Sequence, residues 1–113
     1  MNIQIFGTKK SSDARKAERW FKERRIKFQY VNLAEKELSK GELRSVAQAV
    51  GGIAALIDEK AKDAYAVSLV QHTPAAMLED VLLENQQVLR TPIVRNGRQA
   101  TVGYQPDIWK NWK

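Results

Sequence analysis

The chain has 113 residues, which is enough for one hydrophobic core and too few for two ordinary domains. Hydrophobic residues make up 43% and charged residues 28%, and no apolar run approaches the roughly 20 residues of a membrane span, so disordered and transmembrane chains are excluded. The sequence contains no cysteine and one histidine, His72, which excludes disulfides, thiolate metal sites and cysteine nucleophiles.

The first third of the chain predicts a strand, a helix and a strand. Residues 2–6 and 26–33 alternate between polar and apolar side chains, as strands do. Between them, three residues offer N-cap oxygens for a helix that continues to about residue 24: Ser11, Ser12 and Asp13. Its apolar stripe consists of Ala14, Ala17, Trp20 and Phe21. The short connection predicts that the two strands are parallel.

The middle of the chain is predicted to be helical. Ser39 and Glu42 form a capping box for a helix that ends at Gly51-Gly52. A short apolar turn or helix over 53–57 and an exposed charged stretch over 58–63 follow. Thr73-Pro74 predicts a cap with proline at the first helical position. Four side chains of this helix are predicted to point inward: Met77, Leu78, Val81 and Leu82.

The end of the chain predicts a return to sheet. Residues 92–95 and 98–102 flank Asn96-Gly97, which predicts a hairpin with a type I′ turn. Gly103 ends the second strand, and residues 106–109 begin a short helix. We therefore predict an α/β fold in a single domain, 1–113. A four-stranded mixed sheet is built from a βαβ half and a ββα half, with a helical insertion over about 36–88.

Three stretches resemble the arsenate-reductase (ArsC)/Spx-like family, in the glutaredoxin group of the thioredoxin-like superfamily. Residues 5–17, with Arg15-Lys16-Ala17, are similar to the strand, loop and "C-x-x-C-R-K-A" helix start of that family. Residues 56–60, with Tyr65, are similar to its "LLN-x-R" segment. The third stretch resembles its "RP-[IV]-[VL]…dG…vG" ending and comprises residues 91–94, Asn96-Gly97 and Val102-Gly103. The resemblance implies a thioredoxin-like fold.

The resemblance also implies where a site would lie. Ser11 stands at the position of the family's nucleophilic cysteine. Three residues stand where the family's enzymes use arginines to hold an oxyanion: Lys60, Thr91 and Tyr104. Of these only Lys60 is cationic, and lysine lacks the bidentate fork of arginine. Pro92 matches the proline that is cis beside the active site in thioredoxin-like folds.

The chemistry of Ser11 differs from that of a cysteine. A helix N-terminus can stabilise a thiolate, but a serine hydroxyl needs an adjacent general base, and His72 lies in the predicted insertion. Ser11 is therefore predicted to cap the helix. The loop remains a candidate weak anion site through its backbone amides and the side chains of Lys10, Ser11, Ser12 and Arg15, with Asp13 opposing a bound anion.

Three functions follow from these observations. The first is a regulatory module without catalysis, for which the Spx branch implies an acidic partner such as the C-terminal domain of the RNA polymerase α subunit. The second is a thiol-dependent arsenate reductase whose cysteine is replaced by Ser11 in this chain, with glutathione as the thiol. The third, ranked last, is nucleic-acid binding through exposed basic residues: Lys9, Lys10, Arg15, Lys16, Arg19, Lys22, Arg24, Arg25 and Lys27. We expect a cytoplasmic monomer that binds no metal and no membrane, since the first residues lack the pattern of a signal peptide.

Overall fold

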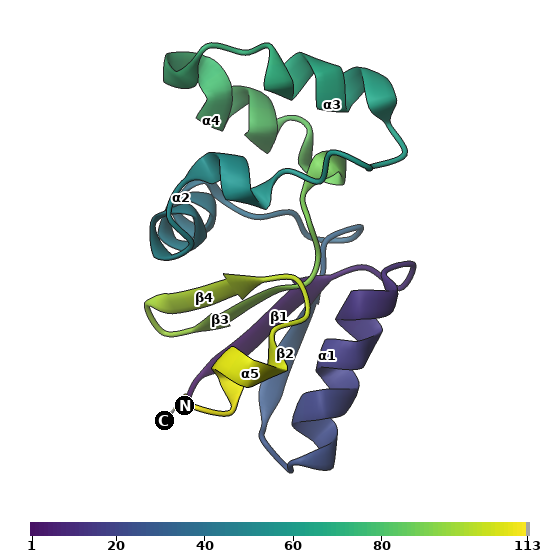
Figure 1. The fold of residues 1–113 in the computed structure, drawn as a ribbon, viewed down its shortest axis with the longest axis vertical. Helices are drawn as coiled ribbons and strands as arrows, with labels where there is room; N and C mark the ends of the chain where they lie inside the picture. The colour runs from purple at the N-terminus through teal and green to yellow at the C-terminus, as the bar shows by residue number, and fades with distance from the viewer. Residues whose placement is uncertain (113) are drawn as a thin grey trace.

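The fold is built around a four-stranded mixed sheet. The computed structural model describes residues 1–112. The strands are β1 (Ile3–Gly7), β2 (Phe28–Asn32), β3 (Ile93–Asn96) and β4 (Gln99–Val102), in the spatial order β2-β1-β3-β4 (Figure 1). β1 and β2 are parallel, and the other two pairs are antiparallel. The predicted βαβ and ββα halves are thereby confirmed.

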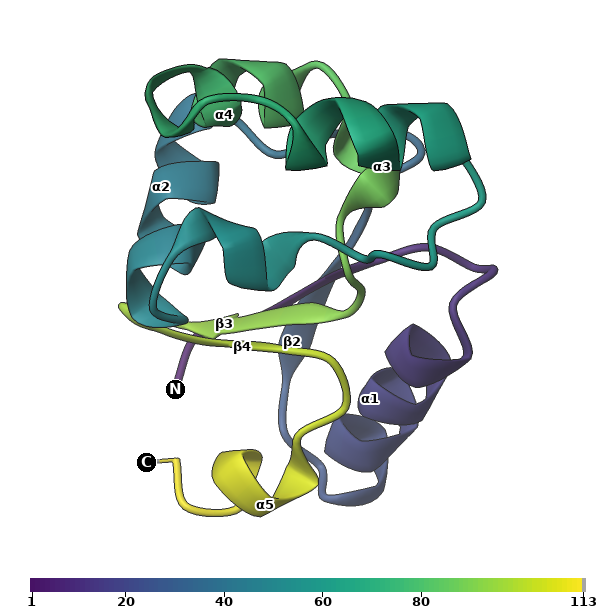
Figure 2. The ribbon, with the colours of Figure 1, turned by 45° about the horizontal axis from the view of Figure 1, so that its top comes forward.

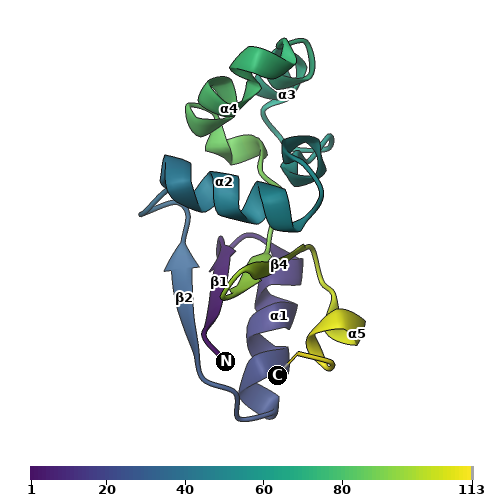
Figure 3. The same cartoon turned by 90° about the vertical axis from the view of Figure 1, so that its left-hand side faces the viewer.

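Helices cover both faces of this sheet. On one face lie α1 (Ser12–Glu23) and the short α5 (Pro106–Trp109); the elements between β2 and β3 lie on the other (Figures 2 and 3). Those elements are α2 (Lys40–Ala49), the 3₁₀ turn η1 (Ile53–Leu56), α3 (Ala64–Gln71), α4 (Ala75–Leu83) and the 3₁₀ turn η2 (Gln86–Val88).

Alternation along β1 divides the core into two clusters. Ile3 and Ile5 pack with Trp20, Phe21 and Trp109 on the α1 side. Phe6 faces the insertion and packs into the larger cluster that contains Leu43 and Val46 of α2 and Leu82 of α4. Successive strand residues point to opposite faces, so a five-residue strand anchors both layers.

Gly7, the last residue of β1, allows α1 to approach the sheet closely. A Cβ atom placed on Gly7 would lie 2.7 Å from the Cβ of Ala14 and 3.1 Å from the hydroxyl of Tyr30. Ala14 itself is fully buried. Two small residues in contact therefore fix the first turn of α1 against the end of β1.

The capping box predicted for α2 is confirmed. The Glu42 amide donates to Ser39 Oγ at 3.1 Å, and the Ser39 amide donates to Glu42 Oε1 at 2.9 Å. The helix ends at Val50, before Gly51-Gly52 with positive φ at both glycines. The predicted turn over 53–57 is η1, and the charged stretch 58–63 is a loop.

The predictions for α3 and α4 were wrong in part. No helix was predicted over 64–71, where Asp63 caps α3 by accepting a hydrogen bond from the Ala66 amide at 3.0 Å. Thr73 does not cap α4, because its hydroxyl donates to the Leu69 carbonyl at the end of α3, and Pro74 takes the N-cap position.

Met77 was predicted to point inward, but its side chain is exposed. Leu78, Val81 and Leu82 form one stripe of α4 on the core, with Leu82 fully buried. At about 100° per residue, Met77 falls about a quarter turn away from the centre of that stripe.

The hairpin is also displaced from its predicted position. Asn96 pairs with Gln99, so the turn residues are Gly97 and Arg98, and of these only Gly97 has positive φ, at 61°. That pattern is of type II′ and not type I′. Asn96 belongs to β3 because it is buried and its side-chain oxygen accepts a hydrogen bond from the Asn2 amide at 3.2 Å.

The close approach at Gly7 generates a stability prediction. Gly7→Ala should lower the free energy of unfolding by about 1–3 kcal/mol, because the new methyl group overlaps Ala14. Gly41→Ala in α2, where a Cβ meets nothing within 4 Å, is the matched control and should be neutral or stabilising by up to about 1 kcal/mol. Urea denaturation measures both, and equal stabilities for the two variants would contradict the packing account.

The cap of α3 generates a pH prediction. The Ala66 amide and, secondarily, the Gln87 side chain donate to the Asp63 carboxylate and lower its pKa. A lowered folded-state pKa contributes stability that is present above the unfolded pKa of about 4 and is lost as pH falls through the folded value. Asp63→Asn should therefore lose less stability than the wild-type protein between neutral pH and pH of about 3, measured by urea unfolding. Identical profiles would argue against this cap.

Candidate functional site

Strand register brings three loops to one end of the sheet. Gly7 ends β1 opposite Asn32, and Phe6 pairs with Ile93 at the start of β3, which in turn pairs with Val102 at the end of β4. The β1–α1 loop, the segment 90–92 and the β4–α5 loop therefore leave the sheet from the same end (Figures 1 and 2). These loops carry Lys10, Ser11, Thr91-Pro92 and Tyr104, and Ser12 begins α1 directly after the first loop.

Ser11 is the N-cap of α1, as predicted. Its φ and ψ of −83° and 114° are extended, and its Oγ accepts a hydrogen bond from the Ala14 amide at 3.1 Å. Its carbonyl accepts from the Arg15 amide, and its own amide donates to the Thr8 carbonyl. The hydroxyl oxygen is thus held by the helix backbone.

Among the described residues, the side chains of the other members of the predicted anion site form no hydrogen bond with the Ser11 hydroxyl. Lys10, Ser12 and Arg15 are all exposed, and within residues 1–112 their side chains form no ion pair. Asp13 lies in the same turn and is within 4.0 Å of Lys16. Lys10 and Arg15 are therefore available to an anion, whereas the Asp13 carboxylate at the helix N-terminus opposes one.

The Thr91–Pro92 peptide bond is cis, as the resemblance implied. The Pro92 carbonyl accepts a hydrogen bond from the Gly103 amide at 2.8 Å, which ties this segment to the β4–α5 loop. Arg90, one residue earlier, was missed by the sequence analysis. Its guanidinium lies against Gly103, where an added Cβ would be 3.4 Å from Nη2. The sequence indicated a place for Arg90 near the site only through its position directly before Thr91-Pro92.

Lys60 lies in the exposed loop after η1. The Asp58 amide donates a hydrogen bond to the Val88 carbonyl, and the Asp58 carboxylate accepts one from the Lys60 amide. A third hydrogen bond runs from the Arg90 amide to the Leu56 carbonyl. These bonds place the loop beside segment 88–90. Among the described residues, no hydrogen bond joins the side chains of Ser11, Lys60, Thr91 and Tyr104.

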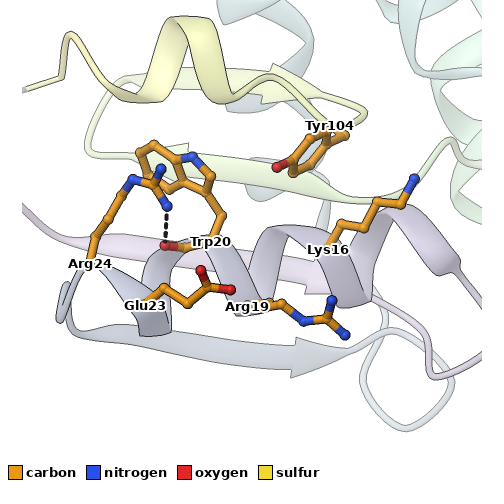
Figure 4. A pocket seen from close by; sticks show the side chains of 6 residues that line it. All are labelled: Lys16, Arg19, Trp20, Glu23, Arg24 and Tyr104. Carbon is orange, nitrogen blue, oxygen red and sulfur yellow. Dashed lines mark hydrogen bonds between the residues drawn. The ribbon is translucent and has the colours of Figure 1, made fainter.

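Tyr104 lies beside the middle and the C-terminal half of α1 (Figure 4). Together with Lys16, Arg19, Trp20, Glu23 and Arg24 it lines a surface hollow of about 220 Å³ (Figure 4). Its ring meets Trp109 edge-on, with 5.5 Å between ring centroids. By resemblance, Tyr104 was predicted at one of the three oxyanion-holding positions, and this hollow was not predicted.

In residues 1–112, no side chain that could act as a base forms a hydrogen bond with the Ser11 hydroxyl. His72 follows α3, and its Nδ1 is 2.8 Å from the Ser68 carbonyl. The α3–α4 turn that contains it lies at the opposite side of the insertion from the β1–α1 loop (Figures 1 and 2). His72 is therefore not placed to take a proton from the Ser11 hydroxyl, and no other side chain of the described residues is hydrogen-bonded to it.

All nine basic residues of the first quarter are exposed. Lys16 and Lys22 lie near carboxylates of their own helix, Asp13 and Glu18. The aromatic residues Trp20 and Phe21 are buried, as predicted, so they cannot stack on bases.

No helix in residues 1–112 has the length and apolar character needed to cross a bilayer. Within the same residues, His, Asp and Glu side chains do not gather in groups of three that could hold a metal ion.

Comparison with known proteins gives consistent matches. A model of the ArsC family matches residues 6–112. The global transcriptional regulator Spx 2 of Oceanobacillus iheyensis is 27% identical over 128 aligned positions, covering 100% of this chain and 94% of the relative.

Solved structures match the fold closely. An arsenate reductase from Vibrio cholerae superposes with a TM-score of 0.81 at 22% identity, covering 96% of this chain and 94% of that one. A Bacteroides fragilis protein described as related to the ArsC family gives 0.83 at 19% identity, covering 100% and 98%. These likenesses confirm the predicted thioredoxin-like fold with its four-stranded mixed sheet.

The position of Ser11 generates a prediction about its role. Ser11→Ala should lower the free energy of unfolding by about 1 kcal/mol, because the Ala14 amide loses its acceptor. Ser12→Ala is the control: this exposed hydroxyl has no hydrogen-bond partner in the described residues, and alanine favours the helix. If Ser11→Ala unfolds at the wild-type urea concentration, the capping role is wrong.

Proposed function

The chain belongs to the ArsC family, and we propose that it acts within this family as a regulatory module that binds an acidic protein partner and performs no thiol chemistry. The proposal joins two features of the molecule. The fold resembles ArsC-type structures over nearly the whole chain, and Ser11 stands where the resemblance places the family's nucleophilic cysteine. A folded domain without a reactive group can still present a surface.

The observation that carries the proposal is the state of Ser11. Its Oγ accepts the Ala14 amide at 3.1 Å, and the sequence contains no cysteine at any position. Reduction of arsenate or of a disulfide by this family begins with attack by a thiolate. A serine hydroxyl without a neighbouring base remains protonated and cannot replace that thiolate at neutral pH.

The partner that we propose is the C-terminal domain of the RNA polymerase α subunit. A relative at 27% identity is named a global transcriptional regulator, Spx 2. The net charge of +6 supports an acidic partner, because opposite charges accelerate association. Exposed cations on α1 and the adjoining loops supply much of that charge.

The proposed function includes neither thiol-dependent arsenate reduction nor nucleic-acid binding. Glutathione would act by forming a mixed disulfide with a protein sulfur, and the chain has no cysteine to form it. Nucleic-acid binding through α1 would lack aromatic stacking, because Trp20 and Phe21 are 7% and 1% exposed.

The proposal predicts direct binding that depends on salt. The purified protein and the purified C-terminal domain of the α subunit should form a 1:1 complex in isothermal titration calorimetry. The association rate in stopped flow should fall several-fold between about 50 and 300 mM salt, since charge steers the encounter. An unrelated basic protein with a net charge near +6 is the control. Absence of heat and of complex at low salt would refute the proposed function.

A further inference from the structure

The outer edge of β2 is open. β2 is the last strand on its side of the sheet, and no strand within residues 1–112 pairs with its outer edge (Figure 3). In a β-ladder, successive residues direct their amides and carbonyls to opposite sides of the strand. The Leu33 amide donates to the Gly7 carbonyl at 2.9 Å, so the register of β1 and β2 turns the odd-numbered residues of β2 toward β1. Phe28, Tyr30 and Asn32 therefore direct their amides and carbonyls outward.

Most of these outward groups have no hydrogen-bond partner in the part of the chain that the structure describes. The exception is the Asn32 carbonyl, which accepts the amides of Glu35 and Lys36 at 3.0 and 2.9 Å. The Asn32 amide remains available, as do the amides and carbonyls of Phe28 and Tyr30. An edge of this kind can add a strand from another chain.

The opposite edge of the sheet, formed by β4, is less open. The Gly103 amide donates to the Pro92 carbonyl, so the register of β3 and β4 turns the backbone of Ala100 and Val102 outward. The side chain of Gln105 already donates to the Val102 carbonyl at 3.1 Å. An added strand would have to displace that bond at β4, whereas at β2 it finds three successive outward residues.

The side chains of β2 leave apolar surface beside the open edge. Phe28 and Tyr30 are half-buried against the core cluster on the α1 side, where the Phe21 and Phe28 ring centroids are 6.3 Å apart. Val31 is half-buried against the cluster on the insertion side. A strand added at this edge would cover the exposed parts of these side chains on both faces of the sheet.

The charges on either side of β2 favour a second copy of the same strand. Arg25 and Lys27 precede β2, and Glu35 and Glu37 follow it, with Lys36 between the two glutamates. All five side chains are exposed and form no ion pair within residues 1–112. An antiparallel copy would bring the basic start of each strand beside the mostly acidic end of the other, whereas a parallel copy would place like charges together.

We propose that β2 pairs antiparallel with β2 of a second copy of this chain, about a twofold axis at Tyr30. The Tyr30 amide donates to the Tyr30 carbonyl of the second copy, and the Asn32 amide donates to its Phe28 carbonyl. Symmetry makes each of these bonds twice and places the two Tyr30 side chains opposite each other. Because the paired strands are short, the dimer is weak, with a dissociation constant on the order of 100 μM. The monomer expected from the sequence is then the state at low concentration.

The first test is a charge exchange across the paired strands. Sedimentation equilibrium of the full chain in about 150 mM salt, which screens the repulsion between two basic copies, should show dimers between about 10 μM and 1 mM protein. Lys27→Glu and Glu35→Lys should each raise the dissociation constant at least about threefold, and the double variant should return it to within roughly twofold of the wild type. Lys62→Glu, in the exposed loop 58–63, is the matched control and should stay within roughly twofold.

Hydrogen exchange measured by nuclear magnetic resonance locates the contact without any substitution. Between low and high protein concentration, the amides of Tyr30 and Asn32 should exchange at least about threefold more slowly, while the outward amide of Ala100 in β4 should not change. A chain that stays monomeric at about 1 mM overturns the proposal. So does a dimer that protects Ala100 in place of Tyr30 and Asn32, or one that both single charge variants leave intact. None of these results bears on the binding of the acidic partner, which is measured separately.

Discussion

The hydrogen bond from the Ala14 amide to Ser11 Oγ joins the fold of this protein to its function. It is a local N-cap bond that begins α1, and the contact between Gly7 and Ala14 places this first turn against the end of β1. The same geometry would present a thiol to the helix N-terminus, where amides and the helix dipole favour an anion. With a hydroxyl at this position, the Ala14 amide donates to the Ser11 side chain and the bond caps the helix.

The two sides of the sheet serve different purposes in this account. The insertion packs the larger core on one side, through Phe6 of β1 and Leu82 of α4. On the other side, Trp109 contacts Trp20 of α1 and Tyr104 of the β4–α5 loop, and it donates a hydrogen bond to Thr101 of β4. Because the sequence contains no cysteine, no disulfide contributes to this packing.

Local patterns in the sequence predicted most of the architecture, because alternation, caps and glycines act over a few residues. The cap at Ser11, the capping box at Ser39 and the parallel βαβ unit all follow from such patterns. Two of the errors come from competing hydrogen bonds, one long-range and one local. Asn96 stays in β3 because Asn2, at the other end of the chain, bonds to it, and Thr73 serves the end of α3 in place of the start of α4. The hollow beside Tyr104 combines residues 80 or more positions apart, and no single segment could indicate it.

The most direct test of the central claim is a turnover measurement on the wild-type chain. Arsenate, glutathione and glutaredoxin are supplied with the purified protein, and consumption of reducing equivalents is followed against a buffer blank. The account predicts a rate equal to the blank, since no residue of the chain can form the thiolate that attacks arsenate. A rate that rises above the blank in proportion to protein concentration would contradict it.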